Sequence, residues 1–172
     1  LGGEDVGAEK PSALSRRGLV RTFQQTTVFN ELTAFDNVLI ATHNFADQSM
    51  LSAAWQGEGF RRREAECAER AMALLARVGL AEQAHAQASS MSYGQLRHLS
   101  IAVALGAGPK VLLLDEPAAG LNPSEAEDLA NPLRRLAAEG LSILLVEHNV
   151  PMMMGLCDRI VVVHHGELVT TG

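Results

Sequence analysis

The sequence lacks the features that mark membrane-spanning, disulfide-bonded and nucleic-acid-binding proteins. Its longest apolar runs, such as Val111 to Leu114 and Ile143 to Val146, are far shorter than the roughly 20 residues that cross a bilayer. The only two cysteines, Cys67 and Cys157, lie far apart, as is typical of proteins from a reducing compartment. The net charge is -6, and this acidic balance argues against a nucleic-acid partner, which would favour a basic face.

The spacing of metal-ligating histidines is missing too, because the six histidines are scattered without it. We therefore expect no histidine to bind a metal ion. The length of 172 residues suits one domain with room for a small insertion. The chain begins at Leu1, in a polar and glycine-rich stretch, so we expect it to be part of a longer protein.

Apolar periodicity predicts an α/β protein built on a mostly parallel sheet. The apolar runs within 111–117 and 141–148 are typical of buried parallel strands, and 18–23 is a shorter β-prone segment. A hairpin is expected over 159–172, with its turn at His165–Gly166. The remaining periodic segments predict helices at 37–43, 61–78, 95–105, 124–138 and 150–157.

Capping signals delimit three of these helices. Thr33 or Asp36 is expected near the start of the first, and Gly79 occupies the left-handed position expected after the second. Ser124 is the expected N-cap of the helix that it begins. Pro132 falls inside that helix and should kink it or remove a hydrogen bond.

Two acids, Asp115 and Glu116, follow the first long apolar run. In an open parallel sheet, ligand sites lie beyond the carboxyl ends of the strands. There the first acid can hold Mg²⁺, directly or through water, and the second can polarise an attacking water molecule. The alternative is that both acids simply end a strand in solvent.

Three further polar positions have both a functional and a structural interpretation. His148 ends the next apolar run, where it can donate a hydrogen bond to a developing phosphate charge or lie unused on the surface. Gln24 can contact a metal ion or a water molecule, or be a solvated loop residue. The stretch "SYGQ" at 92–95 places a hydroxyl and bare amides at a helix start, which suits an anion but equally an ordinary serine cap.

In their order and spacing, these positions together resemble the ATP-binding subunit of an ABC transporter. Gln24 matches the glutamine of the Q-loop, and "SYGQ" at 92–95 matches the signature motif, whose commoner form is Ser-Gly-Gly-Gln. The other matches are Walker B at 111–115, the catalytic glutamate at Glu116, the D-loop "AGLNP" at 119–123 and the switch histidine at His148.

The resemblance implies a partial P-loop NTPase (RecA-like) core with a mostly parallel sheet and an inserted α-helical subdomain. Residues 1–24 would end the N-terminal part of the core at the Q-loop. Residues 25–98 would form the helical subdomain with the signature motif, and residues 99–172 would contain Walker B, the D-loop and the switch histidine. The implied cofactors are ATP and Mg²⁺.

The same resemblance assigns roles to individual residues. It implies that Asp115 and Gln24 are metal ligands and that Glu116 and His148 are catalytic. The nucleotide-binding residues it implies are Gln24, Ser92, Tyr93, Gly94, Gln95 and Asn122. In this family the signature motif acts on ATP held by the opposite subunit, so two copies, or one copy and a paralogue, would sandwich two ATP molecules.

A narrower likeness is to the LivG-like ATPase subunits of branched-chain amino acid importers. It rests on "RTFQ" at 21–24, "VFNELTAFDNVLIATH" at 28–43, "LLLDEPAAGLNPSE" at 112–125 and the stretch 146–172. Importers of urea and short-chain amides share much of this pattern and remain an alternative. The implied partners are a second ATP-binding subunit, transmembrane permease subunits and, indirectly, an extracytoplasmic substrate-binding protein. The subunit would be peripheral on the cytoplasmic face of the inner (plasma) membrane.

One motif of the family, the Walker A loop G-x-x-x-x-G-K-[ST], has no match in the sequence. The family places it well upstream of the Q-loop, and only 23 residues precede Gln24, so we expect it before Leu1. Without it, this chain alone is expected to bind ATP weakly and to expose apolar sheet edges. The alternative is a truncated, non-catalytic remnant.

Overall fold

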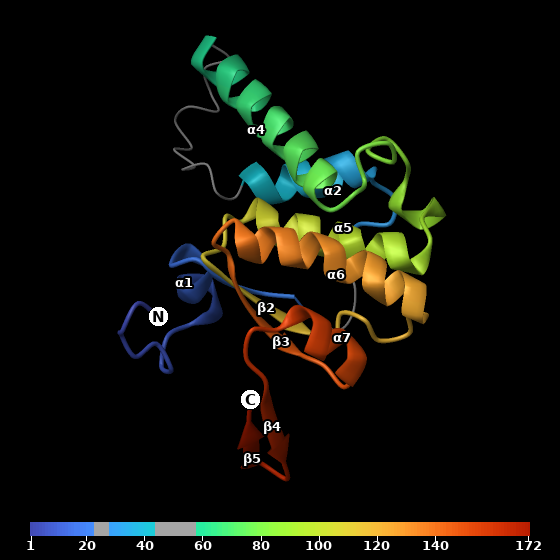
Figure 1. Ribbon diagram of the computed structural model, residues 1–172. Coiled ribbons are helices and arrows are strands. Elements are labelled where there is room, and N and C mark those ends of the chain that lie inside the picture. The colour runs from blue at the N-terminus through green and yellow to red at the C-terminus, as the bar shows by residue number, and fades with distance from the viewer. Residues whose placement is uncertain (23–27, 44–57) are drawn as a thin grey trace.

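The computed structural model describes residues 1–22, 28–43 and 58–172. Three strands form a parallel sheet in spatial order: β1 (Leu19–Arg21), β2 (Val111–Asp115) and β3 (Ser142–Val146). A separate antiparallel pair, β4 (Val161–His164) and β5 (Glu167–Thr171), extends away from this sheet at the C-terminal end of the chain (Figure 1).

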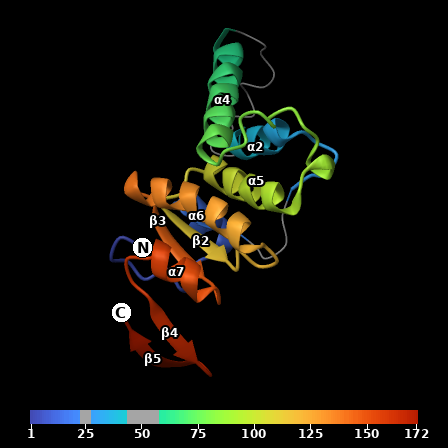
Figure 2. The ribbon, with the colours of Figure 1, turned by 45° about the vertical axis from the view of Figure 1, so that its right-hand side comes forward.

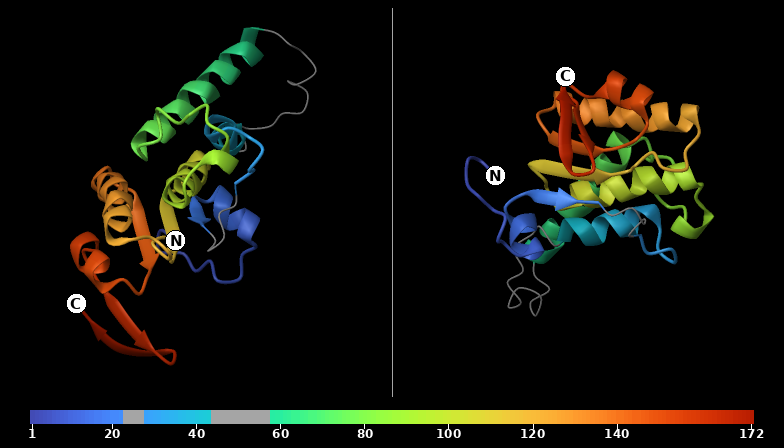
Figure 3. Two further views of the ribbon diagram at one scale, coloured as in Figure 1. Left: turned by 90° about the vertical axis from the view of Figure 1, so that its right-hand side faces the viewer. Right: turned by 90° about the horizontal axis from the view of Figure 1, so that it is seen from below.

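Four of the described helices form two layers on one side of the sheet. The described helices are α1 (Pro11–Arg16), α2 (Ala34–His43), α4 (Glu58–Arg77), η1 (Ala88–Ser90, a 3-10 turn), α5 (Tyr93–Gly106), α6 (Pro123–Ala138) and α7 (Val150–Leu156). Helices α5 and α6 lie side by side next to the sheet, while α2 and α4 lie beyond α5 (Figures 1 and 2). The hairpin and α4 occupy opposite ends of the molecule, as the left-hand view of Figure 3 also shows.

The predicted α/β fold with a parallel sheet is confirmed. The strand expected over 18–23 is present as β1, and the connection from β2 through α6 to β3 returns the chain in parallel, as βαβ units do. Gln24, which was predicted to contact nucleotide and metal, lies outside the described residues.

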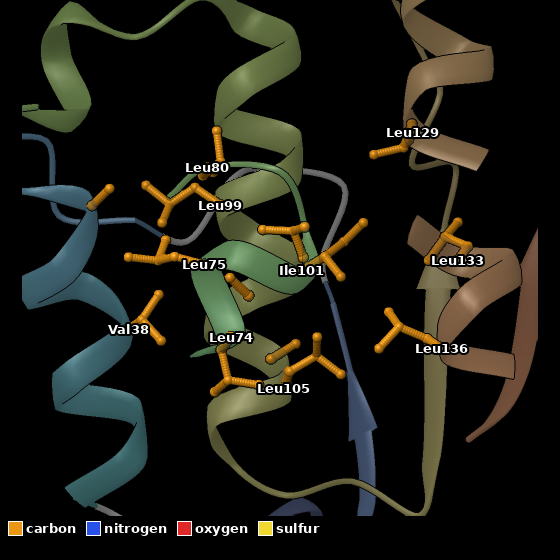
Figure 4. Close-up of a cluster of buried hydrophobic side chains, with 14 of the residues drawn as sticks. Val38, Leu74, Leu75, Leu80, Leu99, Ile101, Leu105, Leu129, Leu133 and Leu136 are labelled. Carbon is orange, nitrogen blue, oxygen red and sulfur yellow. The ribbon is translucent and has the colours of Figure 1, made fainter. Parts of the chain in front are cut away.

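The hydrophobic core centres on α5, which packs between α2 and α6 (Figure 4). Its largest fully buried side chains come from five helices and strands or their ends: Val38, Leu75, Val78, Leu99, Ile101, Leu112, Leu114, Leu129, Leu133 and Leu136. Burying each such side chain contributes about 1.5–3 kcal/mol relative to leaving it exposed. At Gly106 the two helices α5 and α2 approach so closely that a Cβ there would lie 2.7 Å from the Cβ of Ala41.

Helix α4 follows its predicted pattern. The apolar positions Ala71, Leu75 and Val78 are buried, as the helical period requires. Gly79 has a φ of +81°, and the N–H of Leu80 donates to the carbonyl of Leu75 at 2.8 Å. This left-handed glycine ends the helix as predicted.

The start of α6 differs from the prediction. Its N-cap is Asn122 rather than Ser124, because the Asn122 side chain accepts from the N–H of Glu125 and the Glu125 carboxylate accepts from the N–H of Asn122. Pro123, which has no N–H to leave unpaired, then fits the first helical position. The helix continues through Pro132, whose ring is buried in the core.

Two other predicted turns are present. Helix α2 starts at Ala34, after Thr33, whose hydroxyl accepts from the N–H of Asp36 at 3.0 Å. The hairpin turns at His165 and Gly166, which both have positive φ values of 49° and 82°. Two successive positive φ angles give the tight turn that matches the twist of a hairpin.

The prediction that β3 is a buried strand is wrong. It is the last strand of the parallel sheet, and its burial alternates, with Leu144 59% and Val146 56% exposed. Both residues line an apolar groove of about 750 Å³ between β3, α7 and β4. Ile143 and Leu145, which alternate with these two residues, pack against the core, so Leu144 and Val146 lie on the face of the sheet that points away from it.

Candidate functional site

The carboxyl ends of the three parallel strands meet at one edge of the sheet. Asp115, the last residue of β2, pairs in register with Val146 of β3. Its Oδ2 accepts a hydrogen bond from Nη2 of Arg21, the last residue of β1, at 2.8 Å. Because the Asp115 side chain is 32% exposed, its carboxylate lies within reach of solvent and ligands. This is the end of a parallel sheet at which ligands usually bind.

Glu116 turns the chain sharply out of β2. Its φ is +45°, a left-handed conformation that costs a residue with a side chain about 1–3 kcal/mol. The N–H of Glu116 donates to the carbonyl of Val146 at 2.8 Å, which fixes this turn against the end of β3. The strain therefore falls on the residue that was predicted to act on water.

His148 and Glu147 follow β3 and differ strongly in exposure. The His148 side chain is 74% exposed, whereas the Glu147 side chain is 1% exposed. Glu147 Oε1 accepts from the N–H of Ala118 at 2.8 Å, and Oε2 accepts from the N–H of His148 at 2.9 Å. A buried carboxylate thus joins the turn after β2 to the turn after β3.

A second contact holds the loop after β2 from the side of α5. The Tyr93 hydroxyl donates to the carbonyl of Ala119 at 3.1 Å and accepts from the guanidinium of Arg97. The Arg97 guanidinium also lies over the Tyr93 ring, 4.9 Å from its centroid. At Gly120, where φ is +80°, an added Cβ would lie 3.2 Å from Tyr93, so glycine permits both the turn and the close approach.

Helix α5 begins with a complete capping box. The Ser92 hydroxyl accepts from the N–H of Gln95, and the Gln95 side chain accepts from the N–H of Ser92 at 2.9 Å. The start of α6 lies alongside, since an added Cβ on Gly94 would be 3.7 Å from the Glu125 carboxylate. The structural interpretation of Ser92 as a cap is therefore confirmed, and its predicted contact with a nucleotide stays a prediction.

The predicted site residues fall into two groups. Asp115, Glu116 and His148 lie on the turns at the ends of β2 and β3. The second group lies at the adjoining starts of α5 and α6, and it comprises Ser92, Tyr93, Gly94, Gln95 and Asn122. The loop after β2 joins the two groups, because Tyr93 holds Ala119 and Glu147 holds Ala118.

Sequence reasoning missed two residues of this site. Arg21 was read only as part of "RTFQ", and its pairing with Asp115 depends on the order of the strands. Glu147 was passed over as the neighbour of His148, although an acid directly before a histidine at a strand end was a visible signal. No group of three or more histidine, cysteine or acidic residues that suits a metal ion occurs within residues 1–22, 28–43 and 58–172.

Comparisons with known proteins identify the family. The sequence profile described as "ABC transporter" matches residues 1–119. The chain is 39% identical to the high-affinity branched-chain amino acid transport ATP-binding protein BraF of Pseudomonas aeruginosa, over 100% of this chain and 68% of that protein. It is 41% identical to LivG of Salmonella typhimurium, of the same description, over 92% of this chain and 63% of that protein.

A solved structure supports the same assignment. A nucleotide-free ATP-binding cassette from an ABC transporter superimposes with a TM-score of 0.80 at 29% identity, over 98% of this chain and 66% of that chain. The chain thus spans roughly two thirds of the length of the proteins it matches. None of the helices in the described part of the chain is long and apolar enough to cross a membrane. With the family profile, the relatives and the fold in agreement, the chain belongs to the ABC transporter family.

Proposed function

We propose that this chain is the ATP-binding and ATP-hydrolysing subunit of an importer for branched-chain amino acids. The observation that carries the proposal is the meeting of Asp115, Glu116 and His148 on neighbouring turns at the end of the parallel sheet. The names of its relatives, which are ATP-binding proteins of branched-chain amino acid transport, supply the substrate class.

The two catalytic residues have complementary tasks in this proposal. The Glu116 carboxylate accepts a hydrogen bond from the attacking water and aligns it with the γ-phosphorus. The exposed His148 imidazole donates a hydrogen bond to a γ-phosphate oxygen as negative charge develops there. The turns that carry both residues are joined by the hydrogen bond from the Glu116 N–H to the Val146 carbonyl and by the buried Glu147 carboxylate.

Asp115 is the residue suited to hold Mg²⁺. Carboxylate oxygens are the protein ligands that this cation prefers, and it usually takes only one or two of them together with phosphate oxygens and water. Arg21 occupies Oδ2 of Asp115, and the carboxylate has a second oxygen. When bound with ATP, the cation would neutralise charge on the β- and γ-phosphates. Gln24 is proposed as a further ligand.

The start of α5 is proposed to bind the γ-phosphate of ATP held by a second subunit. The positive end of the helix dipole favours an anion there, and Gly94 leaves room near the backbone. Ser92 and Gln95 contribute polar side chains, and Asn122 lies at the adjoining start of α6. The Tyr93 hydroxyl bonds within its own subunit, which favours a role for Tyr93 in holding the loop after β2 beside this surface.

We propose that the phosphate-binding loop comes from the remainder of a longer protein. The sequence contains no G-x-x-x-x-G-K-[ST] stretch, and its relatives are about one and a half times as long. This chain alone should therefore hydrolyse ATP poorly. In the complete importer, it would lie at the cytoplasmic face of the membrane, bound to permease subunits through the helical insertion at about 37–90. The substrate-binding protein would act on the outer side.

ATP hydrolysis by two forms of the chain tests the nucleotide part of this proposal. One form is the printed chain, and the other is extended with the residues its relatives carry beyond the matched region. We expect only the extended form to hydrolyse ATP. In that form, Glu116→Gln should lower the hydrolysis rate at least a thousandfold. The control Glu69→Gln, which changes an exposed residue on α4, should leave the rate unchanged. Rapid ATP hydrolysis by the 172-residue chain itself would show that it needs no further phosphate-binding loop. An inactive extended chain with Glu116 intact would favour the non-catalytic remnant.

Transport measurements test the substrate class. The extended subunit is reconstituted with its permease and substrate-binding protein, and ATP-dependent uptake of labelled leucine and labelled urea is compared. Leucine uptake that stops in Glu116→Gln is the expected result. Uptake of urea or a short-chain amide in place of leucine would assign the importer to the related class.

A further inference from the structure

Glu147 follows β3, and its carboxylate is buried and bonded to backbone amides. Its side chain is 1% exposed, and its oxygens accept hydrogen bonds from three backbone amides. Those of Ala118, His148 and Asn149 lie at 2.8, 2.9 and 3.2 Å. Backbone donors to a charged acceptor form stronger hydrogen bonds than neutral pairs do, so this arrangement is a strong local link.

The three amides belong to two different turns. Oε1 binds Ala118, two residues after Glu116, whereas Oε2 binds the N–H groups of His148 and Asn149. Asn149 in turn caps α7 by accepting from the N–H of Met152 at 3.1 Å. A single side chain thus bridges the turn that carries Glu116 and the turn that carries His148.

We propose that Glu147 is a positioning residue, which sets the spacing between the Glu116 turn and the His148 turn and so aligns both residues with the γ-phosphate. The inference rests on the proposed function of these two residues. Glu147 itself does not touch substrate, because its carboxylate is enclosed and its oxygens are engaged by backbone donors. A misplacement of about 1 Å at a reacting group costs up to about a hundredfold in rate.

The substitution Glu147→Gln breaks the bridge without changing the volume of the side chain. The glutamine side chain has one oxygen and one NH₂ group. In either orientation its oxygen accepts from the amides of one turn, while its NH₂ group faces the N–H groups of the other turn, with which it cannot form a hydrogen bond. Glu147→Asp is the second variant: it keeps both oxygens but is one methylene too short to reach Ala118. The matched control is Glu69→Gln, exposed on α4.

Amide hydrogen exchange of the printed chain tests the bridge without any nucleotide. In Glu147→Gln, we expect exchange to quicken at least tenfold at Ala118 or at His148 and Asn149, and in Glu147→Asp at Ala118. The control should leave all three amides unchanged. Unchanged exchange at all three amides in both variants would overturn the proposal, because the bond between Glu116 and Val146 would then be sufficient.

The kinetic test uses the extended, hydrolysing form. We expect Glu147→Gln to lower kcat about ten- to a hundredfold while KM for ATP changes less than about twofold. In a His148→Ala background, the same substitution should lower kcat by a smaller factor than in the parent, because only Glu116 then remains to be aligned. An equal loss in both backgrounds would identify a general structural effect and overturn the proposal. If His148→Ala alone left kcat unchanged, the proposed role of His148 would be wrong instead.

Discussion

Strands β2 and β3 are neighbouring parallel strands of five residues each, with nearly uniform apolar sequences, yet they differ in burial. In β2, Leu112 and Leu114 are buried at 0% and 1% exposure. In β3, Leu144 and Val146 are more than half exposed. These two pairs lie on opposite faces of the sheet, because Leu112 and Leu114 pair in register with Ile143 and Leu145, which pack against the core, whereas Leu144 pairs with Leu113. Within each registered pair the β3 residue is the more exposed, because β3 is at the edge of the three described strands.

The ends of the two strands reverse this contrast. After β2, the Asp115 carboxylate is partly exposed and pairs with the exposed side chain of Arg21. After β3, the Glu147 carboxylate is buried and bound by backbone amides, whereas His148 is exposed. Each strand is thus followed or ended by one side chain that a ligand can reach, Asp115 or His148. Each strand end also has a side-chain contact, which is the Arg21 pair at β2 and the Glu147 bridge at β3. The apolar environment of a strand does not determine how its polar end is used.

The largest expected difference between the strands is in stability. Leu114→Ala should lower the free energy of unfolding by about 2–5 kcal/mol, because it leaves a cavity in a closed core. Leu144→Ala should cost less than about 1 kcal/mol, because the side chain is mostly in water. Urea denaturation of both variants and the parent chain measures this. Equal losses of unfolding free energy in the two variants would mean that the exposed face of β3 is covered in solution. If a second copy of the chain covers it, the unfolding midpoint would depend on protein concentration.

The thiol of Cys157, which lines the groove beside β3, gives a second comparison. Burial raises the pKa of Cys157 above the ordinary value of 9.0, and the negative charge of Asp158 raises it further. Since the thiolate is the reactive form, iodoacetamide should modify Cys157 in the folded chain several-fold more slowly than in the unfolded chain at pH 9. As the pH is raised, the modification rate of Cys157 in the folded chain should reach its plateau at a higher pH than in the unfolded chain.

Peptide mass spectrometry separates modification of Cys157 from that of Cys67. Asp158→Asn should shift the pH dependence only slightly toward lower pH, because burial is the larger cause. A folded-chain rate equal to that of the unfolded chain would show that the groove beside β3 is fully open to solvent.

The smallest expected effect concerns the ion pair at the end of β2. Arg21→Gln should cost about 0–1 kcal/mol of unfolding free energy, because the pair between Arg21 and Asp115 is well exposed. The loss should shrink further in 1 M salt, where the Debye length falls to about 3 Å. Denaturation at low and high salt measures this. A loss above about 2 kcal/mol that persists in high salt would show that the pair is shielded from solvent.

Local signals predicted much of the fold. Helical periodicity gave α4 and α5, the glycine after α4 ended it, and the His165–Gly166 pair gave the hairpin turn. Ser124 was wrong as a cap because asparagine, proline and glutamate at 122, 123 and 125 offer a complete reciprocal box that begins two residues earlier. Burial of β3 was wrong because an apolar run does not show whether one face or both faces of a strand are covered.

The sequence by itself determined which residues have the chemistry for phosphate transfer and in what order they occur, because motif spacing is a local property. It also determined the family, through the joint pattern of those motifs. Only the tertiary structure decided that Arg21 meets Asp115, that Tyr93 holds Ala119 and that Glu147 joins two turns. Those contacts link residues 26 to 94 positions apart, and only the packing of strands and helices brings such residues together.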